Sequence, residues 1–116
     1  LVGSQSASSV EYISNTRPIP ACKTDIIIAT AIAGELMGNK LIYLEAGSGS
    51  EKVIKRNIIS EVKKNISIPL IVGGGIKTRD DIKDIFEAGA DIVVVGSAVE
   101  ENPEMIKTFA QVAWLF

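Results

Sequence analysis

The sequence lacks histidine, and it contains a single cysteine, Cys22, among its 116 residues. The absence of histidine excludes Ser-His and Cys-His nucleophile pairs and metal sites built from imidazole ligands. One cysteine excludes a disulfide within the chain and favours a reducing, cytoplasmic compartment. Because no histidine is present to activate its thiol, we interpret Cys22 as a small, half-buried residue that precedes a helix. Any metal would be a hard cation held by oxygen ligands or by a substrate diphosphate.

A charge imbalance and a long apolar run are also missing. The sequence has 12 Lys and Arg against 14 Asp and Glu, a net charge of −2, so we expect no nucleic-acid partner. The longest apolar stretch, near Ile26 to Ala33, is much shorter than the roughly 20 residues of a membrane-spanning helix. With 47% hydrophobic and 22% charged residues, the composition is typical of an ordinary folded domain.

Short apolar segments alternate with helical patterns along most of the chain. Strands without polar alternation are typical of a parallel sheet covered on both faces, and this order predicts an α/β fold with right-handed crossovers. An open doubly wound sheet and a (β/α)8 barrel both fit, although the dinucleotide fingerprint Gly-x-Gly-x-x-Gly is absent. We expect strands at residues 40–44, 69–72 and 91–95, with weaker candidates at 1–3 and 10–13 and an extended segment at 17–20. We expect helices at 24–37 with Thr24 as N-cap, 51–65, 78–89 with a Thr78 and Asp81 capping box, and 103–116.

Two glycine-containing turns follow two of the expected strands. Gly73-Gly74-Gly75 comes after the strand at 69–72, and Gly96-Ser97 comes after the strand at 91–95, before a short segment at 98–101. Glycine lets an anion approach backbone N–H groups, and barrels bind phosphate in the loops after strands 7 and 8 with a short extra helix. Ser97 can add a hydroxyl donor. The alternative is that both are simply tight turns between strand and helix.

A third turn, residues 43–49, carries a phenol and a carboxylate. Tyr43 and Glu45 are two residues apart at the end of a strand, so their side chains point to the same side. Together they could hold a polyol, and Glu45 could accept a hydroxyl proton. The alternative is that Glu45 only fixes its loop by accepting hydrogen bonds from the backbone N–H groups of residues 47–49.

These motifs resemble the consecutive signatures of the geranylgeranylglyceryl phosphate synthase family, whose scaffold is shared by heptaprenylglyceryl phosphate synthases. The resemblance lies in Tyr-Leu-Glu-Ala-Gly-Ser-Gly at 43–49, Ile-Val-Gly-Gly-Gly-Ile at 71–76 and residues 89–97, and residues 14–20 resemble one branch of the family. It covers about residues 9–105. The resemblance implies a (β/α)8 TIM barrel. Its reaction would transfer a geranylgeranyl group from geranylgeranyl diphosphate to the sn-3 hydroxyl of sn-glycerol 1-phosphate, the first ether bond of archaeal-type membrane lipids.

The resemblance also implies roles for individual residues. Glu45 and Tyr43 would be catalytic, with Glu45 taking the hydroxyl proton. Ser97 replaces the Thr or Asn of many members. Mg²⁺ would act on the diphosphate, but the family's metal-binding aspartate lies on the first strand, so no metal ligand is expected in this chain. The expected ligands of sn-glycerol 1-phosphate are Tyr43, Leu44, Glu45, Ala46, Gly47, Ser48, Gly49, Gly74, Gly75, Gly96 and Ser97.

The chain is short for such a barrel, which needs about 200–250 residues. We therefore expect a single domain that is roughly the C-terminal half of a longer enzyme, with residues missing between about Gln5 and Ser9. The prenyl chain length is not predicted. We expect a homo-oligomer, in which the aromatic end at 114–116 either contacts another subunit or closes the barrel core.

Two other functions remain open. A different phosphate-binding barrel, such as a flavin-mononucleotide oxidoreductase or a phosphosugar isomerase, would share both glycine turns. It would not require the Tyr43 and Glu45 pair. The second alternative is a non-catalytic half-barrel that binds a phosphorylated ligand.

Overall fold

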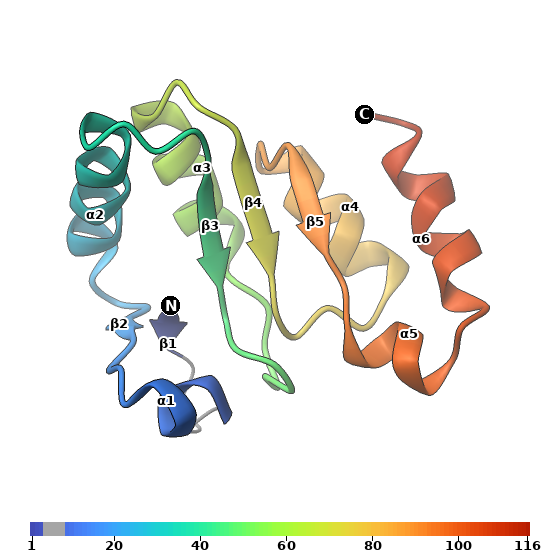
Figure 1. The fold of residues 1–116 in the computed structure, drawn as a ribbon. Coiled ribbons are helices and arrows are strands. Elements are labelled where there is room, and N and C mark those ends of the chain that lie inside the picture. Colours follow the sequence, from blue (N-terminus) through green and yellow to red (C-terminus); the bar gives the residue numbers. More distant parts are fainter. Residues whose placement is uncertain (4–8) are drawn as a thin grey trace.

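A computed structural model describes residues 1–3 and 9–116 and shows an α/β fold (Figure 1). Its centre is a parallel sheet in the order β3-β4-β5, and β1 pairs in parallel with β2 in a separate ladder. The predicted α/β class and the alternation of helix and strand are confirmed. The elements are β1 (Val2–Gly3), α1 (Ser9–Ser14), β2 (Ile19–Pro20), α2 (Thr24–Leu36), β3 (Ile42–Glu45), α3 (Arg56–Asn65), β4 (Leu70–Gly73), α4 (Arg79–Glu87), β5 (Ile92–Val94), α5 (Ser97–Glu101) and α6 (Met105–Ala113).

The two faces of the central sheet have different environments. One face packs against the apolar sides of α3 and α4 (Figure 1), and Leu44, Leu70 and Val72 on it are at most 5% exposed. On the other face, Tyr43, Ile92 and Val94 are 42–47% exposed. Within the described residues, helices therefore cover one face only, although the apolar strands led us to expect cover on both. In a closed barrel the second face lines the interior.

The register of the strands fixes where their ends meet. Glu45 pairs with Gly73, and Gly73 pairs with Val94. Because the strands are parallel, these three residues lie side by side at the carboxyl edge of the sheet, where α/β proteins bind ligands. The turns that follow β3, β4 and β5 are thereby brought to one place.

Several local predictions are confirmed. Thr78 accepts a hydrogen bond from the Asp81 N–H (3.1 Å), and Asp81 accepts one from the Thr78 N–H (2.8 Å), which makes the capping box of α4. Helix α2 ends before Gly38, as expected. The strand at 1–3 and the extended segment at 17–20 are present as β1 and β2.

Other local predictions are wrong. Residues 10–13, a weak strand candidate, lie in α1, where Tyr12 and Ile13 are more than 80% exposed and belong to neither ladder of the described residues. The N-cap of α2 is Lys23 rather than Thr24, and no side chain caps that helix. The proposed gap between about Gln5 and Ser9 falls on residues 4–8, outside the described residues.

Helices α3 and α6 begin later than predicted, for local reasons. At residues 51–55, the Ser50 hydroxyl donates to the Lys52 carbonyl (2.9 Å) and keeps the chain in a loop, so α3 begins at Arg56. The Asn102 side chain accepts a hydrogen bond from the Glu104 N–H (3.2 Å). This turn delays α6 to Met105. None of the helices in the described part of the chain is long and apolar enough to cross a membrane.

At the amino edge of the sheet, Asp91 joins β4 to β5 and α3. Its Oδ2 accepts hydrogen bonds from the Leu70 N–H (2.7 Å) and from Nζ of Lys63 (2.6 Å). The Leu70 N–H, followed by the Lys63 ammonium, lowers the pKa of the Asp91 carboxyl below its usual value, because both favour the charged form. The Asp91 carboxylate thus accepts the hydrogen bond of the first N–H group of β4.

We predict that Asp91→Asn lowers the free energy of unfolding of the full-length protein by about 1 kcal/mol at pH 7, a value reduced for solvent screening. The contribution of Asp91 is fully present above the pKa of the unfolded chain, about 4. It is lost as pH falls through the lower pKa of the folded state, so the two proteins should converge in acid. Urea unfolding at pH 7 and at low pH measures this. Glu104→Gln, in an exposed pair with Lys107 that makes no backbone bond, should have little effect. An equal loss in both variants would contradict the role of the Leu70 bond.

Candidate active site at the carboxyl edge of the sheet

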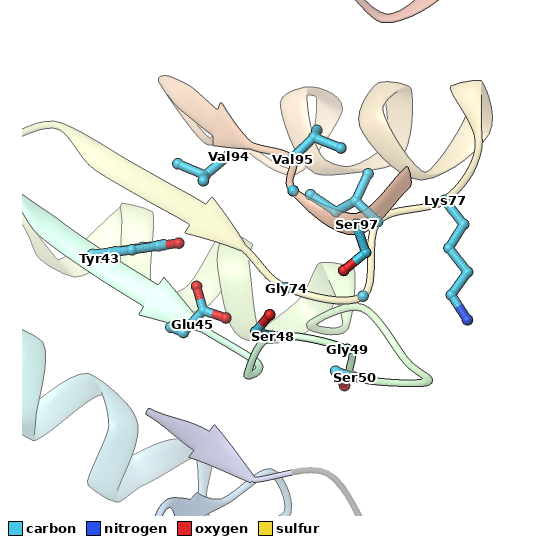
Figure 2. Close-up of a pocket in the computed structure, with 13 residues that line it drawn as sticks. Tyr43, Glu45, Ser48, Gly49, Ser50, Gly74, Lys77, Val94, Val95 and Ser97 are labelled. Atoms are coloured by element: carbon cyan, nitrogen blue, oxygen red, sulfur yellow. The ribbon is translucent and has the colours of Figure 1, made fainter. Parts of the chain in front are cut away.

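A cavity of about 340 Å³ lies at the carboxyl edge of the sheet (Figure 2). The turns after β3, β4 and β5 form its walls. Most of the residues predicted to bind a ligand are brought together there. Its lining is Tyr43, Glu45, Ser48, Gly49, Ser50, Gly74, Gly75, Ile76, Lys77, Val94, Val95, Gly96 and Ser97.

Tyr43 and Glu45 project from the same side of β3, as the two-residue period predicts (Figure 2). Burial raises the pKa of the Tyr43 phenol, and its hydrogen bond to Glu45 and the negative charge of that carboxylate raise the pKa further. A phenol is protonated at neutral pH even with its ordinary pKa, and here its proton is donated to the Glu45 carboxylate. The pair offers a ligand one phenol and one carboxylate at adjacent positions.

Glu45 also fixes its own loop. Its Oε1 accepts a hydrogen bond from the Gly47 N–H at 2.7 Å, which is the alternative role considered for this residue. The two roles are compatible, because each carboxylate oxygen can accept more than one hydrogen bond. The bond to Gly47 holds the carboxylate in place at the wall of the cavity.

Gly73, Gly74 and Gly75 let β4 and its turn approach β3 closely. A Cβ at Gly73 would lie 2.5 Å from the Tyr43 hydroxyl oxygen. At Gly74 a Cβ would lie 2.7 Å from Oε1 of Glu45, and φ is +88°, which side chains disfavour. At Gly75 a Cβ would lie 2.6 Å from the Lys52 carbonyl oxygen. The three glycines therefore have a packing reason that does not depend on any ligand.

Gly96 differs from these three glycines. A Cβ built at Gly96 would meet nothing within 4 Å, so close packing does not explain a glycine there. Because Gly96 has no side chain, its backbone is open toward the cavity at the start of the short helix α5. The Ser97 hydroxyl lies beside the cavity in Figure 2. Gly96 is the glycine whose position best fits contact with a ligand.

Three of the predicted ligand residues do not line the cavity. Leu44 is 5% exposed and packs in the core behind the sheet, because it alternates with Tyr43 and Glu45. The Ala46 N–H donates to the Gly73 carbonyl (3.0 Å), and the Gly47 N–H donates to Glu45. These three residues shape the loop rather than the surface of the cavity.

Five lining residues were not predicted, and one of them is charged. Lys77 lies two residues after Gly75, and its place just beyond the glycine turn was the sequence signal that could have identified it. The other four form apolar or loop surfaces and carry no distinctive motif: Ser50, Ile76, Val94 and Val95. Within residues 1–3 and 9–116, no cluster of three or more His, Cys, Asp or Glu is placed to hold a metal ion.

Comparison with known proteins gives consistent matches. Residues 3–113 match the PcrB family. The chain is 46% identical over 110 residues to a geranylgeranylglyceryl phosphate synthase of Chitinophaga pinensis, which covers 95% of this chain and 44% of that protein. It is 44% identical over 94 residues to the Pyrococcus abyssi protein of the same name, covering 81% of this chain and 37% of that protein. The chain spans less than half the length of these curated relatives.

The fold is similar to a solved structure. It is the (S)-3-O-geranylgeranylglyceryl phosphate synthase of Thermoplasma acidophilum in complex with its substrate sn-glycerol-1-phosphate, which matches with a TM-score of 0.86 and 30% identity over 97% of this chain and 45% of that chain. The predicted TIM-barrel architecture, with this chain as about half of it, is confirmed. That residues 1–116 form a single domain stays a prediction.

We predict that Gly74→Ala destabilises the full-length protein more than Gly49→Ala does. Both glycines have positive φ, but a Cβ at Gly49 meets nothing within 4 Å, whereas one at Gly74 meets Glu45 and the loop backbone. The positive φ alone lowers the free energy of unfolding of either alanine variant by about 1 kcal/mol. At Gly74 the close contacts of the added Cβ lower it by about 2 kcal/mol more. Urea denaturation of the two variants checks the difference. Equal losses would show that the contact between Gly74 and Glu45 is not tight.

Proposed function

This chain belongs to the PcrB family, and we propose that it is the glycerol-phosphate-binding half of a prenyltransferase. The whole enzyme would move a geranylgeranyl group from geranylgeranyl diphosphate to the sn-3 hydroxyl of sn-glycerol 1-phosphate. The observation that carries the proposal is that Tyr43 and Glu45 line the same cavity as the glycine turns after β4 and β5. Two curated relatives of this chain, from Chitinophaga pinensis and Pyrococcus abyssi, are named geranylgeranylglyceryl phosphate synthases.

The glycerol end of the substrate would lie against Tyr43 and Glu45. In the reaction, the oxygen of the sn-3 hydroxyl forms a bond to C1 of the prenyl group, while the bond from C1 to the diphosphate oxygen breaks and diphosphate leaves. The hydroxyl proton passes to the Glu45 carboxylate, which the Gly47 N–H holds in position. Tyr43 donates its one proton to Glu45, and its oxygen would accept a hydrogen bond from a glycerol hydroxyl and so orient the glycerol.

The phosphate end would lie against the turns after β4 and β5. Gly74 and Gly75 keep the backbone of the first turn close to β3, and Gly96 leaves the second turn open. Ser97 would add a hydroxyl donor at the start of α5. Leu44 anchors β3 in the core, the backbone N–H groups of Ala46 and Gly47 hold the loop, and Ser48 and Gly49 line the cavity beside it.

Mg²⁺ is the cation that we propose for the diphosphate. The described residues include no acidic cluster that fits a metal ion, so the ion would be held by the diphosphate and by residues outside this chain.

We also propose a cytoplasmic location and a homo-oligomer. The single cysteine supports the former. The exposed Trp114 and Leu115, beside a Phe116 ring that stacks on Phe86 at 5.4 Å, support the latter.

We predict that Glu45→Gln lowers the turnover of the full-length enzyme by about 10²–10⁴, the range for loss of a general base. Turnover is measured as ether product by mass spectrometry, with sn-glycerol 1-phosphate, geranylgeranyl diphosphate and Mg²⁺. Glu51→Gln, an exposed carboxylate on the following loop that does not line the cavity, should retain wild-type turnover. Wild-type turnover in Glu45→Gln would remove this residue from the mechanism.

Flavin absorbance in the purified enzyme would favour an oxidoreductase instead.

We predict that EDTA abolishes product formation and that added Mg²⁺ restores it, because the leaving diphosphate needs charge neutralisation. Binding of sn-glycerol 1-phosphate alone, measured by calorimetry, should survive EDTA, since Glu45 is the one carboxylate among the described residues that line its cavity. Full turnover in excess chelator would contradict the proposed cofactor.

A further inference from the structure

The charges around the cavity are few and opposite. Of the residues that line it, Glu45 and Lys77 carry charge. A phosphate monoester carries close to two negative charges near neutral pH. Bound near the Glu45 carboxylate without a cation, such a ligand would experience net repulsion.

Lys77 is available to supply that cation. Among the ion pairs formed by the described residues, Lys63, Lys64, Lys83 and Lys107 have carboxylate partners, and Lys77 takes part in none. Its side chain is exposed at the cavity wall. The ammonium can therefore pair with a ligand without first breaking an ion pair in the protein.

The backbone of Lys77 is held firmly although its side chain is free. Its N–H donates to Oδ2 of Asp81 (3.0 Å), the same oxygen that completes the capping box of α4. The preceding residue, Ile76, is 5% exposed and anchors the turn in the core. A fixed backbone limits where the ammonium can reach.

The two charges lie at different ends of the cavity. Figure 2 shows Tyr43 and Glu45 at one end, and Lys77 at the other end, beyond Ser97. A ligand with a phosphate at one end and hydroxyls at the other is complementary to this arrangement in one orientation only. The reverse orientation would place the phosphate against a carboxylate.

We propose that Lys77 is a substrate-binding residue that supplies positive charge to the phosphate of sn-glycerol 1-phosphate and directs the glycerol hydroxyls toward Glu45. This inference rests on the proposed function. Lysine suits the role because its ammonium is a compact charge on a flexible stem, which pairs with phosphate without fixed fork geometry. The backbone donors of the glycine turns then need not balance the phosphate charge alone.

The test compares Lys77→Gln with Lys83→Gln in the full-length enzyme, since both variants lose one exposed lysine charge, and only Lys77 lines the cavity. We expect Lys77→Gln to raise KM for sn-glycerol 1-phosphate about tenfold, the lower end for a hydrogen bond to a charged group. kcat and KM for geranylgeranyl diphosphate should stay within about twofold. Lys77→Arg should restore most of the affinity, and the defect should shrink in high salt. Lys83→Gln should match wild type, and equal melting temperatures exclude a folding defect.

An unchanged KM for sn-glycerol 1-phosphate in Lys77→Gln overturns the inference and leaves the proposed function intact. A rise in KM for the prenyl diphosphate instead also overturns it, because Lys77 would then serve the other substrate. Calorimetry with inorganic phosphate separates the two hypotheses. If wild type binds phosphate through Lys77 but does not bind sn-glycerol 1-phosphate, the anion site stands and the proposed function fails. If wild type binds neither, both fail.

Discussion

The close approach of β3 and the turn after β4 is the constraint on which the site depends. Two side chains of β3, Tyr43 and Glu45, occupy the space that a Cβ at Gly73 or Gly74 would need. The Ala46 N–H then bonds to the Gly73 carbonyl and extends the pairing beyond the last strand residue. Glycine at these positions is therefore required for the phenol and the carboxylate to lie over the neighbouring strand. Tyr43 and Glu45 fill the space over Gly73 and Gly74. The cavity lies between these two side chains and the end of β5.

Much of the fold could be predicted from the sequence, because the strands and the capping box of α4 have local causes. The apolar run at Leu70–Gly73 marks a buried strand, and the Thr78 and Asp81 pair marks a helix start, within a few residues of sequence. Residues 10–13 could not be predicted in this way. Tyr12 and Ile13 form an exposed helical turn, so neither hydrophobic periodicity nor β-propensity describes their environment.

The candidate site was predictable where a motif has one geometric consequence. The two-residue period placed Tyr43 and Glu45 on one side of β3, and the parallel order brought both glycine turns to the same edge. Leu44 failed as a lining residue for the same reason, since it points to the opposite face. Lys77 was missed because an exposed lysine after a turn is common. Its place on the wall of the cavity distinguishes it from the other exposed lysines.

The cavity walls come from three turns within residues 43–97, and the first two are joined by the hydrogen bond from the Ala46 N–H to the Gly73 carbonyl. Under the proposed function, recognition of the glycerol phosphate would be confined to these turns. Surfaces elsewhere in the full-length enzyme that contact the prenyl chain could then change over evolution without disturbing it. Relatives built on these turns could differ in the hydrophobic group that they transfer while the polar headgroup stays the same.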